Sequence, residues 1–266
     1  MTDLTCDLAL ALALADSADR ITLDRAGAAD LRVEAKPDRS PVTDADLAVE
    51  DAIRAVLQVH RPHDEVVGEE RGGASGNASR AWLLDPIDGT KNFLRGVPVW
   101  ATLIALVNDG EPAVGVISAP ALRRRWWAAT GAGAHTRDPN GTSRAITVSG
   151  VGELADAYLS TTDLGSWTRY RSRESYLSLV DATWESRAFG DFWQHCLVAE
   201  GAIDLAAEPI VNPWDVAAGA CIVQRAGGKV TDFKGGSDFM FGRELCASNS
   251  HVHSPMLTTI QQKWVS

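Results

Sequence analysis

The most informative chemical pattern in the sequence is a pair of closely spaced carboxylates. Residues 82–90 (WLLDPIDGT) form an apolar run that ends in Asp85, with Asp88 three positions later. A strand ending at Asp85, followed by a turn at Pro86, would bring both carboxylates and the Ile87 carbonyl to one point, and such hard oxygen ligands suit Mg²⁺. The backbone N–H groups after Asp88 would face the same point, where a phosphate could bind. Taken alone, Asp-Pro and Asp-Gly are ordinary turn sequences.

Three further acidic positions lie at the ends of predicted elements. Glu69, in Gly68-Glu69-Glu70, follows the preceding predicted strand; Asp46 begins a predicted helix; Asp215 falls in the first turn of another, after Asn212-Pro213. Each position has a structural explanation, because adjacent glutamates are usually solvated and an acid in a first turn complements the helix dipole. Together, acids at four element ends favour a metal site.

Composition limits the partners that this chain can have. It has 266 residues, 45% of them hydrophobic, and a net charge of −10, which fits one large or two tightly joined globular domains. Without a dense basic stretch, neither nucleic acid nor an anionic membrane is the expected partner. An acidic protein can still bind an anionic substrate when metal ions supply positive charge. The Ala/Leu-rich start predicts a helix rather than a signal peptide, and the four scattered cysteines predict reduced thiols in a cytoplasmic protein.

The order of predicted elements divides the chain into two halves. Residues 1–150 predict an α+β half with an antiparallel sheet and most of the metal ligands: helices at 4–28 and from Thr43 or Asp44, and strands at 65–68, 81–85, 100–107 and 113–118. Residues 151–266 predict an α/β half that contains Asp215 and the substrate-selecting segment: strands at 157–161, 183–187, 203–207 and 229–232, and helices at 168–180, 191–202 and 214–226. The Gly- and Ser-rich loop 71–79 either closes over the metals or is a surface loop.

Three motifs together resemble one family. Residues 85–90 (DPIDGT), 68–70 (GEE) and 214–219 (WDVAAG) match the D-P-[IL]-D-G-T, G-E-E and W-D-x-A-[AG]-[AG] motifs of inositol monophosphatase-like, Mg²⁺-dependent and Li⁺-sensitive phosphatases, in the same order and spacing over nearly the whole chain. The resemblance implies a layered αβαβα sandwich and a homodimer. It also implies two or three Mg²⁺ ions, with Mn²⁺ as a substitute. The first is held by Glu69, Asp85 and the Ile87 carbonyl, the second by Asp85, Asp88 and Asp215, and a weaker third lies near Glu69.

The same resemblance assigns the catalytic roles. Thr90, paired with Asp46, and Glu69 should orient or deprotonate the attacking water, while the backbone at Asp88, Gly89 and Thr90 binds phosphate. Metal ions neutralise phosphoryl oxygens, activate water and stabilise the departing oxygen. Because no covalent nucleophile is needed, in-line attack by water is favoured over a covalent intermediate.

The resemblance places substrate choice mostly in the second half of the chain, where the segment reads Arg187-Ala188-Phe189-Gly190-Asp191. It resembles the R-x-x-G-D of the bacterial histidinol-phosphate phosphatase branch, whereas inositol phosphatases usually carry Thr or Ser after the glycine. A carboxylate at 191 can pair with the α-ammonium group of histidinol phosphate; the alternative role is a helix N-cap. The resemblance adds a substrate contact at Glu208. The predicted substrate-binding set is Asp88, Gly89, Thr90, Arg187, Gly190, Asp191, Glu208 and Asp215.

The sequence therefore predicts a cytoplasmic Mg²⁺-dependent phosphatase of histidine biosynthesis that hydrolyses L-histidinol phosphate to L-histidinol and phosphate. One alternative is an inositol-1-phosphate or broader polyol monophosphatase. Another, of a different class, is a non-catalytic metal- or phosphate-binding regulator on the same fold. Against the regulator stands the intact set Asp46, Glu69, Asp85, Asp88, Thr90 and Asp215.

Overall fold

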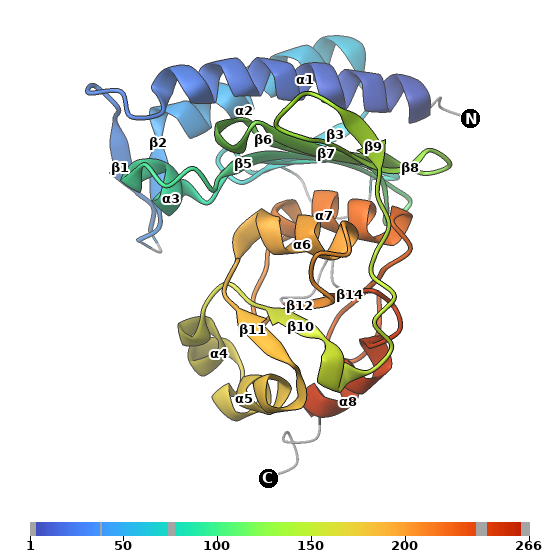
Figure 1. Cartoon of the computed structure of the whole chain (residues 1–266). Coiled ribbons are helices and arrows are strands. Elements are labelled where there is room, and N and C mark those ends of the chain that lie inside the picture. The colour runs from blue at the N-terminus through green and yellow to red at the C-terminus, as the bar shows by residue number, and fades with distance from the viewer. Residues whose placement is uncertain (1–3, 38, 74–77, 238–243, 262–266) are drawn as a thin grey trace.

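Helices and sheets alternate in five layers (Figure 1), in a computed structural model that describes residues 4–37, 39–73, 78–237 and 244–261. The outermost layer holds α1 (Leu4–Arg25) and α2 (Asp44–His60). Thr43 caps α2 because its side chain accepts from the N–H groups of Ala45 and Asp46, while Asp46 accepts in return from the Thr43 N–H. This capping box fixes where α2 begins and turns Asp46 inward, fully buried.

The second layer is a seven-stranded sheet whose one parallel pair positions the site. Its order is β3 (Glu65–Gly68), β4 (Arg80–Asp88), β5 (Ala101–Asn108), β6 (Glu111–Ala119), β7 (Arg124–Ala129), β8 (Gly133–Arg137) and β9 (Ser143–Ala145). All neighbours are antiparallel except β3 and β4. The predicted antiparallel sheet is therefore wrong for that pair. Parallel strands end at the same edge, so Glu69 comes to lie beside β4, where its N–H donates to the Leu84 carbonyl at 3.1 Å.

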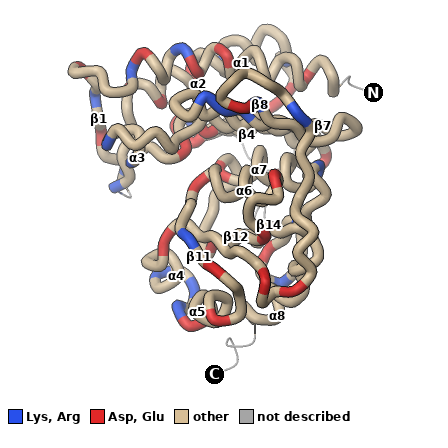
Figure 2. The backbone as a smooth tube through the Cα atoms, in the orientation of Figure 1, with Lys and Arg blue, Asp and Glu red and all other residues tan. Residues whose placement is uncertain are grey.

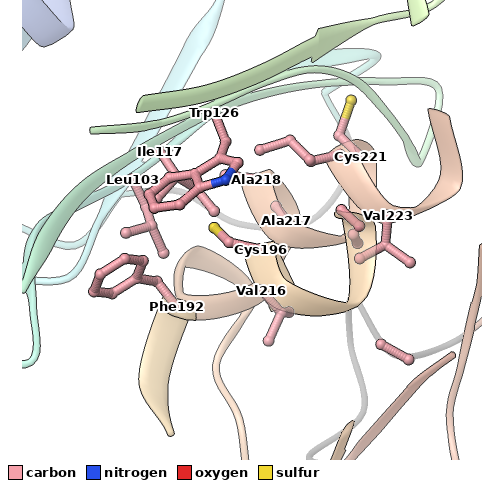
Figure 3. Close-up of a cluster of buried hydrophobic side chains, with 14 of the residues drawn as sticks. Leu103, Ile117, Trp126, Phe192, Cys196, Val216, Ala217, Ala218, Cys221 and Val223 are labelled. Carbon is pink, nitrogen blue, oxygen red and sulfur yellow. The ribbon is translucent and has the colours of Figure 1, made fainter. Parts of the chain in front are cut away.

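The third layer consists of α6 (Asp191–Ala199) and α7 (Pro213–Arg225), packed on the inner face of that sheet. Figure 3 shows the apolar contact, in which Leu103, Ile117 and Trp126 of the sheet face the helices that carry Phe192, Cys196 and Ala218. Trp126 and Phe192 lie 6.2 Å apart between ring centroids. Burial of each large apolar side chain contributes about 1.5–3 kcal/mol, so this cluster stabilises the packing of α6 and α7 on the sheet.

The fourth and fifth layers belong to the second half of the chain. A five-stranded sheet has the order β11 (Glu185–Arg187), β10 (Tyr158–Ser160), β12 (Leu205–Glu208), β14 (Leu245–Ser248) and β13 (Lys229–Thr231). It is covered by α4 (Leu164–Tyr170), α5 (Arg173–Ala182) and α8 (His253–Gln261). The predicted αβαβα sandwich is confirmed.

Several local predictions need correction. The helix expected at 168–180 is two helices, because α4 ends at Tyr170 and Ser172 caps α5 through the Ser175 N–H. Neither β14 nor α8 was predicted. A short hairpin of β1 (Val33–Ala35) and β2 (Pro41–Thr43) precedes α2, and α3 (Thr90–Arg95) follows β4. Of loop 71–79, residues 74–77 lie outside the described part of the chain. No helix among the described residues is long and apolar enough to cross a membrane.

Candidate active site

The carboxyl end of β4 is bent to present its acids. The pairing of β4 with β5 shifts register between Asp85 and Asp88, and the Thr102 hydroxyl donates to the Pro86 carbonyl at 2.8 Å within the bend. Gly89 then adopts a left-handed conformation (φ +83°) as the N-cap of α3. Such a turn suits glycine and interrupts the strand directly after Asp88.

The N-termini of α6 and α7 meet this strand end. The Phe192 N–H, in the first turn of α6, donates to Asp88 Oδ2 at 2.6 Å. In α7, Asp215 Oδ2 accepts from the Asn212 N–H at 2.9 Å and from its side-chain amide at 3.1 Å. Figure 2 shows acidic stretches of the chain on both sides of the boundary between the larger sheet and α6. Asp88, Asp191 and Asp215 line one cavity of about 140 Å³.

Burial and mutual repulsion keep these carboxyls from ionising normally. Burial, reinforced by neighbouring carboxylates, raises the pKa of Asp85 and of Asp88 well above their usual range. Burial also raises the pKa of Asp215 to about 7 and that of Asp46 to about 6, and Glu69 adds repulsion in both cases. Oδ1 of Asp85 and Oδ1 of Asp46 are buried without a hydrogen-bond partner. A divalent cation would supply the missing partner and charge, so this donor set fits a hard metal ion.

A lysine holds Glu69 in this conformation. Lys36 Nζ lies 2.7 Å from Glu69 Oε1 and 2.7 Å from Glu70 Oε1. Within the described ranges, no three side chains of the metal-binding types converge on one point. The ammonium group engages only Oε1 of Glu69, so its Oε2 is left for another partner.

The predicted contact between Thr90 and Asp46 is not formed. The Thr90 hydroxyl donates to the Ile87 carbonyl at 3.0 Å rather than to Asp46. Asp46 Oδ2 instead accepts from the Thr43 hydroxyl at 2.5 Å. Both Thr90 and Ile87 nevertheless stay at the strand end with Asp85, as the motif predicted.

Of the residues predicted to select the substrate, Asp191 lines the cavity and Arg187 lies outside it. Asp191 lies next to Gly89: a Cβ on Gly89 would be 3.6 Å from Asp191 Oδ2. The N-cap of α6 is Gly190, and it makes no side-chain capping bond, so Asp191 does not act as the cap. No described group hydrogen-bonds to the Asp191 carboxylate. Arg187, in contrast, does not line the cavity; it is exposed on β11 and pairs with Glu185 at 2.5 Å.

Glu208 lies at the inner end of the same cavity. It is buried at the end of β12 and accepts from the Thr162 N–H at 2.7 Å and from the Thr162 hydroxyl at 2.9 Å. Burial raises the pKa of its carboxyl to about 7. Glu208 is therefore a hydrogen-bonding group of the cavity wall rather than an isolated charge.

Sequence reasoning missed three residues that shape the site. Lys36 lies in the polar stretch before β2, where nothing in the local pattern connects it to Glu69. Glu50 is fully buried on α2, one turn after Asp46. Gln194 follows Asp191 by three residues and lines the cavity; that helical spacing is the one signal that could have revealed it.

The fold and the site together indicate a class of protein, namely layered α/β proteins in which a cluster of acids suits divalent cations. The chain belongs to the inositol monophosphatase family, because the model of the Inositol monophosphatase family matches residues 3–265. The predicted family is thus confirmed.

A histidinol-phosphatase of Mycobacterium tuberculosis is 52% identical to this chain, over 96% of this chain and 97% of that protein. A histidinol-phosphatase of Streptomyces coelicolor is 47% identical to this chain, over 99% of this chain and 100% of that protein. The solved structure of an inositol monophosphatase from Zymomonas mobilis matches with a TM-score of 0.85 at 32% identity, over 98% and 99% of the two chains.

Proposed function

We propose that this protein is a metal-dependent phosphatase that hydrolyses L-histidinol phosphate to L-histidinol and phosphate. The observation that carries the substrate is the Asp191 carboxylate, which lies beside Gly89 of the predicted phosphate-binding turn and has no hydrogen bond to the described residues. A charge-assisted hydrogen bond from the α-ammonium group would satisfy it. The names of the relatives from Mycobacterium tuberculosis and Streptomyces coelicolor agree with this substrate.

Residues of the strand end and of α7 would hold the metal. We assign this role to Glu69, Asp85, the Ile87 carbonyl, Asp88 and Asp215. Mg²⁺, when bound, would neutralise phosphoryl oxygens and favour ionisation of the attacking water. The repulsion among the buried carboxylates supports this assignment, because only a cation relieves it without protonating them.

The chain's own groups then position the reactants. Glu69 is placed to take a proton from the attacking water. Backbone N–H groups at Gly89 and Thr90 orient the phosphate, and Asp191 fixes the ammonium end of the substrate. The Thr90 hydroxyl holds the Ile87 carbonyl, which keeps the turn in place.

Inositol-1-phosphate is the second candidate substrate, and the structural match to the Zymomonas mobilis inositol monophosphatase favours it. Inositol has no cationic group, so it would leave Asp191 with no hydrogen-bond donor among the described residues and only the positive charge of Lys91 acting on it. Desolvating that carboxylate without a hydrogen-bond partner opposes binding.

The deciding experiment compares Mg²⁺-dependent phosphate release from L-histidinol phosphate and from myo-inositol-1-phosphate under identical conditions. We expect at least a tenfold higher kcat/KM for histidinol phosphate. Equal rates, or a preference for inositol phosphate, would overturn the substrate assignment. The division into halves 1–150 and 151–266, the number of ions, the homodimer and the cytoplasmic location stay predictions.

A further inference from the structure

Gln194 lies on the face of α6 that lines the cavity. It follows Asp191 by three residues and precedes His195, and helix geometry places positions i, i+3 and i+4 on one face. All three side chains border the same cavity, which Glu208 and Thr162 also line. Gln194 is completely buried, so its amide cannot turn to bulk water for hydrogen bonds.

The two ends of the Gln194 amide are not equally satisfied. Its Nε2 donates to Glu208 Oε1, the same oxygen that accepts from Thr162. Its Oε1 is buried and has no hydrogen-bond donor among the described residues. A buried acceptor without a donor costs about 1–3 kcal/mol, and such groups usually meet a ligand or an ordered water. Because Glu208 fixes the orientation of the amide, the oxygen cannot exchange places with the nitrogen to remove this cost.

We propose that Gln194 is a specificity residue whose Oε1 accepts a hydrogen bond from an imidazole N–H of the substrate. This inference rests on the proposed function. Imidazole carries at least one N–H in either protonation state, so it always offers the donor. The cavity that Gln194 lines has a volume of about 140 Å³, several times the roughly 30 Å³ of one liquid water, so it admits more than a single solvent molecule. Asp191 binds the ammonium group near the phosphate, and Gln194 recognises the ring deeper in the cavity.

The test replaces the amide by an apolar group of similar length. In Gln194→Met, Glu208 keeps both hydrogen bonds from Thr162, so the fold should persist. We expect KM for L-histidinol phosphate to rise about tenfold, with kcat within about twofold. Inhibition by L-histidinol should weaken by a similar factor, while inhibition by inorganic phosphate stays unchanged. Gln224→Met is the matched control, because Gln224 is on α7 and does not line the cavity; it should match the wild type.

A second measurement needs no variant. L-Phenylalaninol presents the same amino alcohol with a ring that lacks an N–H, so it should inhibit the wild-type enzyme at least tenfold more weakly than L-histidinol. Equal inhibition by the two alcohols, or a Gln194→Met enzyme whose L-histidinol inhibition is unchanged, would refute the role of Gln194. A wild-type enzyme that does not hydrolyse histidinol phosphate would refute the proposed function instead, so the two failures are distinguishable.

Discussion

The Glu50 carboxylate fills the space beside Gly68. A Cβ on Gly68 would lie 2.1 Å from Glu50 Oε1, far inside van der Waals contact. Glu50 also accepts hydrogen bonds from the N–H groups of Glu70 (2.8 Å) and Arg71 (3.2 Å), and an ion pair to Arg54 at 2.7 Å holds it in place. The turn that carries Glu69 is therefore built on a buried carboxylate of α2.

The Gly68→Ala variant should lose both stability and activity. The added methyl group must displace Glu50 or the turn, and overpacking of this kind costs about 1–3 kcal/mol. We expect a lower thermal midpoint and a phosphatase rate reduced at least tenfold at saturating Mg²⁺. Gly152→Ala is the control, since a Cβ there meets nothing within 4 Å. A Gly68→Ala enzyme as active and stable as Gly152→Ala would show that the close packing is not required.

Glu50→Gln should weaken metal binding more than it affects substrate binding. The substitution places an amide where two backbone N–H groups need acceptors and removes the anionic partner of Arg54, so the Glu69 turn loses its fixed position. We expect the Mg²⁺ concentration for half-maximal activity to rise several-fold, with KM for substrate little changed. Magnesium titrations of activity check this. Glu111→Gln, at an exposed carboxylate at the start of β6, should behave as wild type.

Glu69→Gln distinguishes an enzyme from a binding protein. The loss of a proton acceptor and metal ligand should reduce kcat by about 10²–10⁴-fold, the range typical of general-base removal. Calorimetric binding of inorganic phosphate in the presence of Mg²⁺ should weaken far less. Glu65→Gln, at the opposite end of the same strand, is the control. Turnover that survived Glu69→Gln would contradict the mechanism and favour a regulator.

The layered fold and the gathering of acids around the end of β4 could be predicted because each motif is contiguous in sequence. Residues 85–90 combine an apolar strand with its turn, so their chemistry can be recognised locally. Lys36, Glu50 and Gln194 could not be found in that way, since each matters through a contact that only the tertiary fold creates. The parallel β3–β4 pair was missed for the same reason: strand periodicity does not encode pairing direction. Arg187 is the converse case, a motif position that the structure places outside the cavity, so its substrate role stays a prediction.

The stability of the protein should fall with rising pH, and it should fall more steeply without metal than with it. Folding raises the pKa of Asp215, Glu70 and Glu208 to about 7, above the unfolded values of about 4. The folded chain thus binds more protons than the unfolded chain near neutrality, and stability falls as pH rises through 7. Below about pH 6.5, His195 and His253 oppose this trend, because their folded pKa values are lowered to about 4 by burial.

Thermal unfolding between pH 6.5 and 8 isolates the carboxylate effect. In EDTA we expect the midpoint to fall steadily over this range. In Mg²⁺ it should fall less, because the ion binds the ionised form, so the difference between the two conditions grows with pH. Sodium chloride at equal ionic strength is the control. If the difference between the midpoints in Mg²⁺ and in EDTA became smaller towards pH 8, the result would contradict a carboxylate metal site.

Asp191→Asn should change which substrate the enzyme prefers. The amide keeps the size of the side chain but removes the charge that pairs with an ammonium group, so kcat/KM for L-histidinol phosphate should fall about 10–100-fold, the cost of about 1.4–2.8 kcal/mol. Inositol-1-phosphate offers no cation, and removing a half-buried carboxylate that has no hydrogen-bond donor among the described residues should leave its kcat/KM unchanged or raise it. Glu185→Gln, which alters an exposed carboxylate away from the cavity, controls for net charge. Because the predicted phosphate and metal contacts are shared by both substrates, a parallel loss on both would place Asp191 in the common machinery instead of in substrate selection.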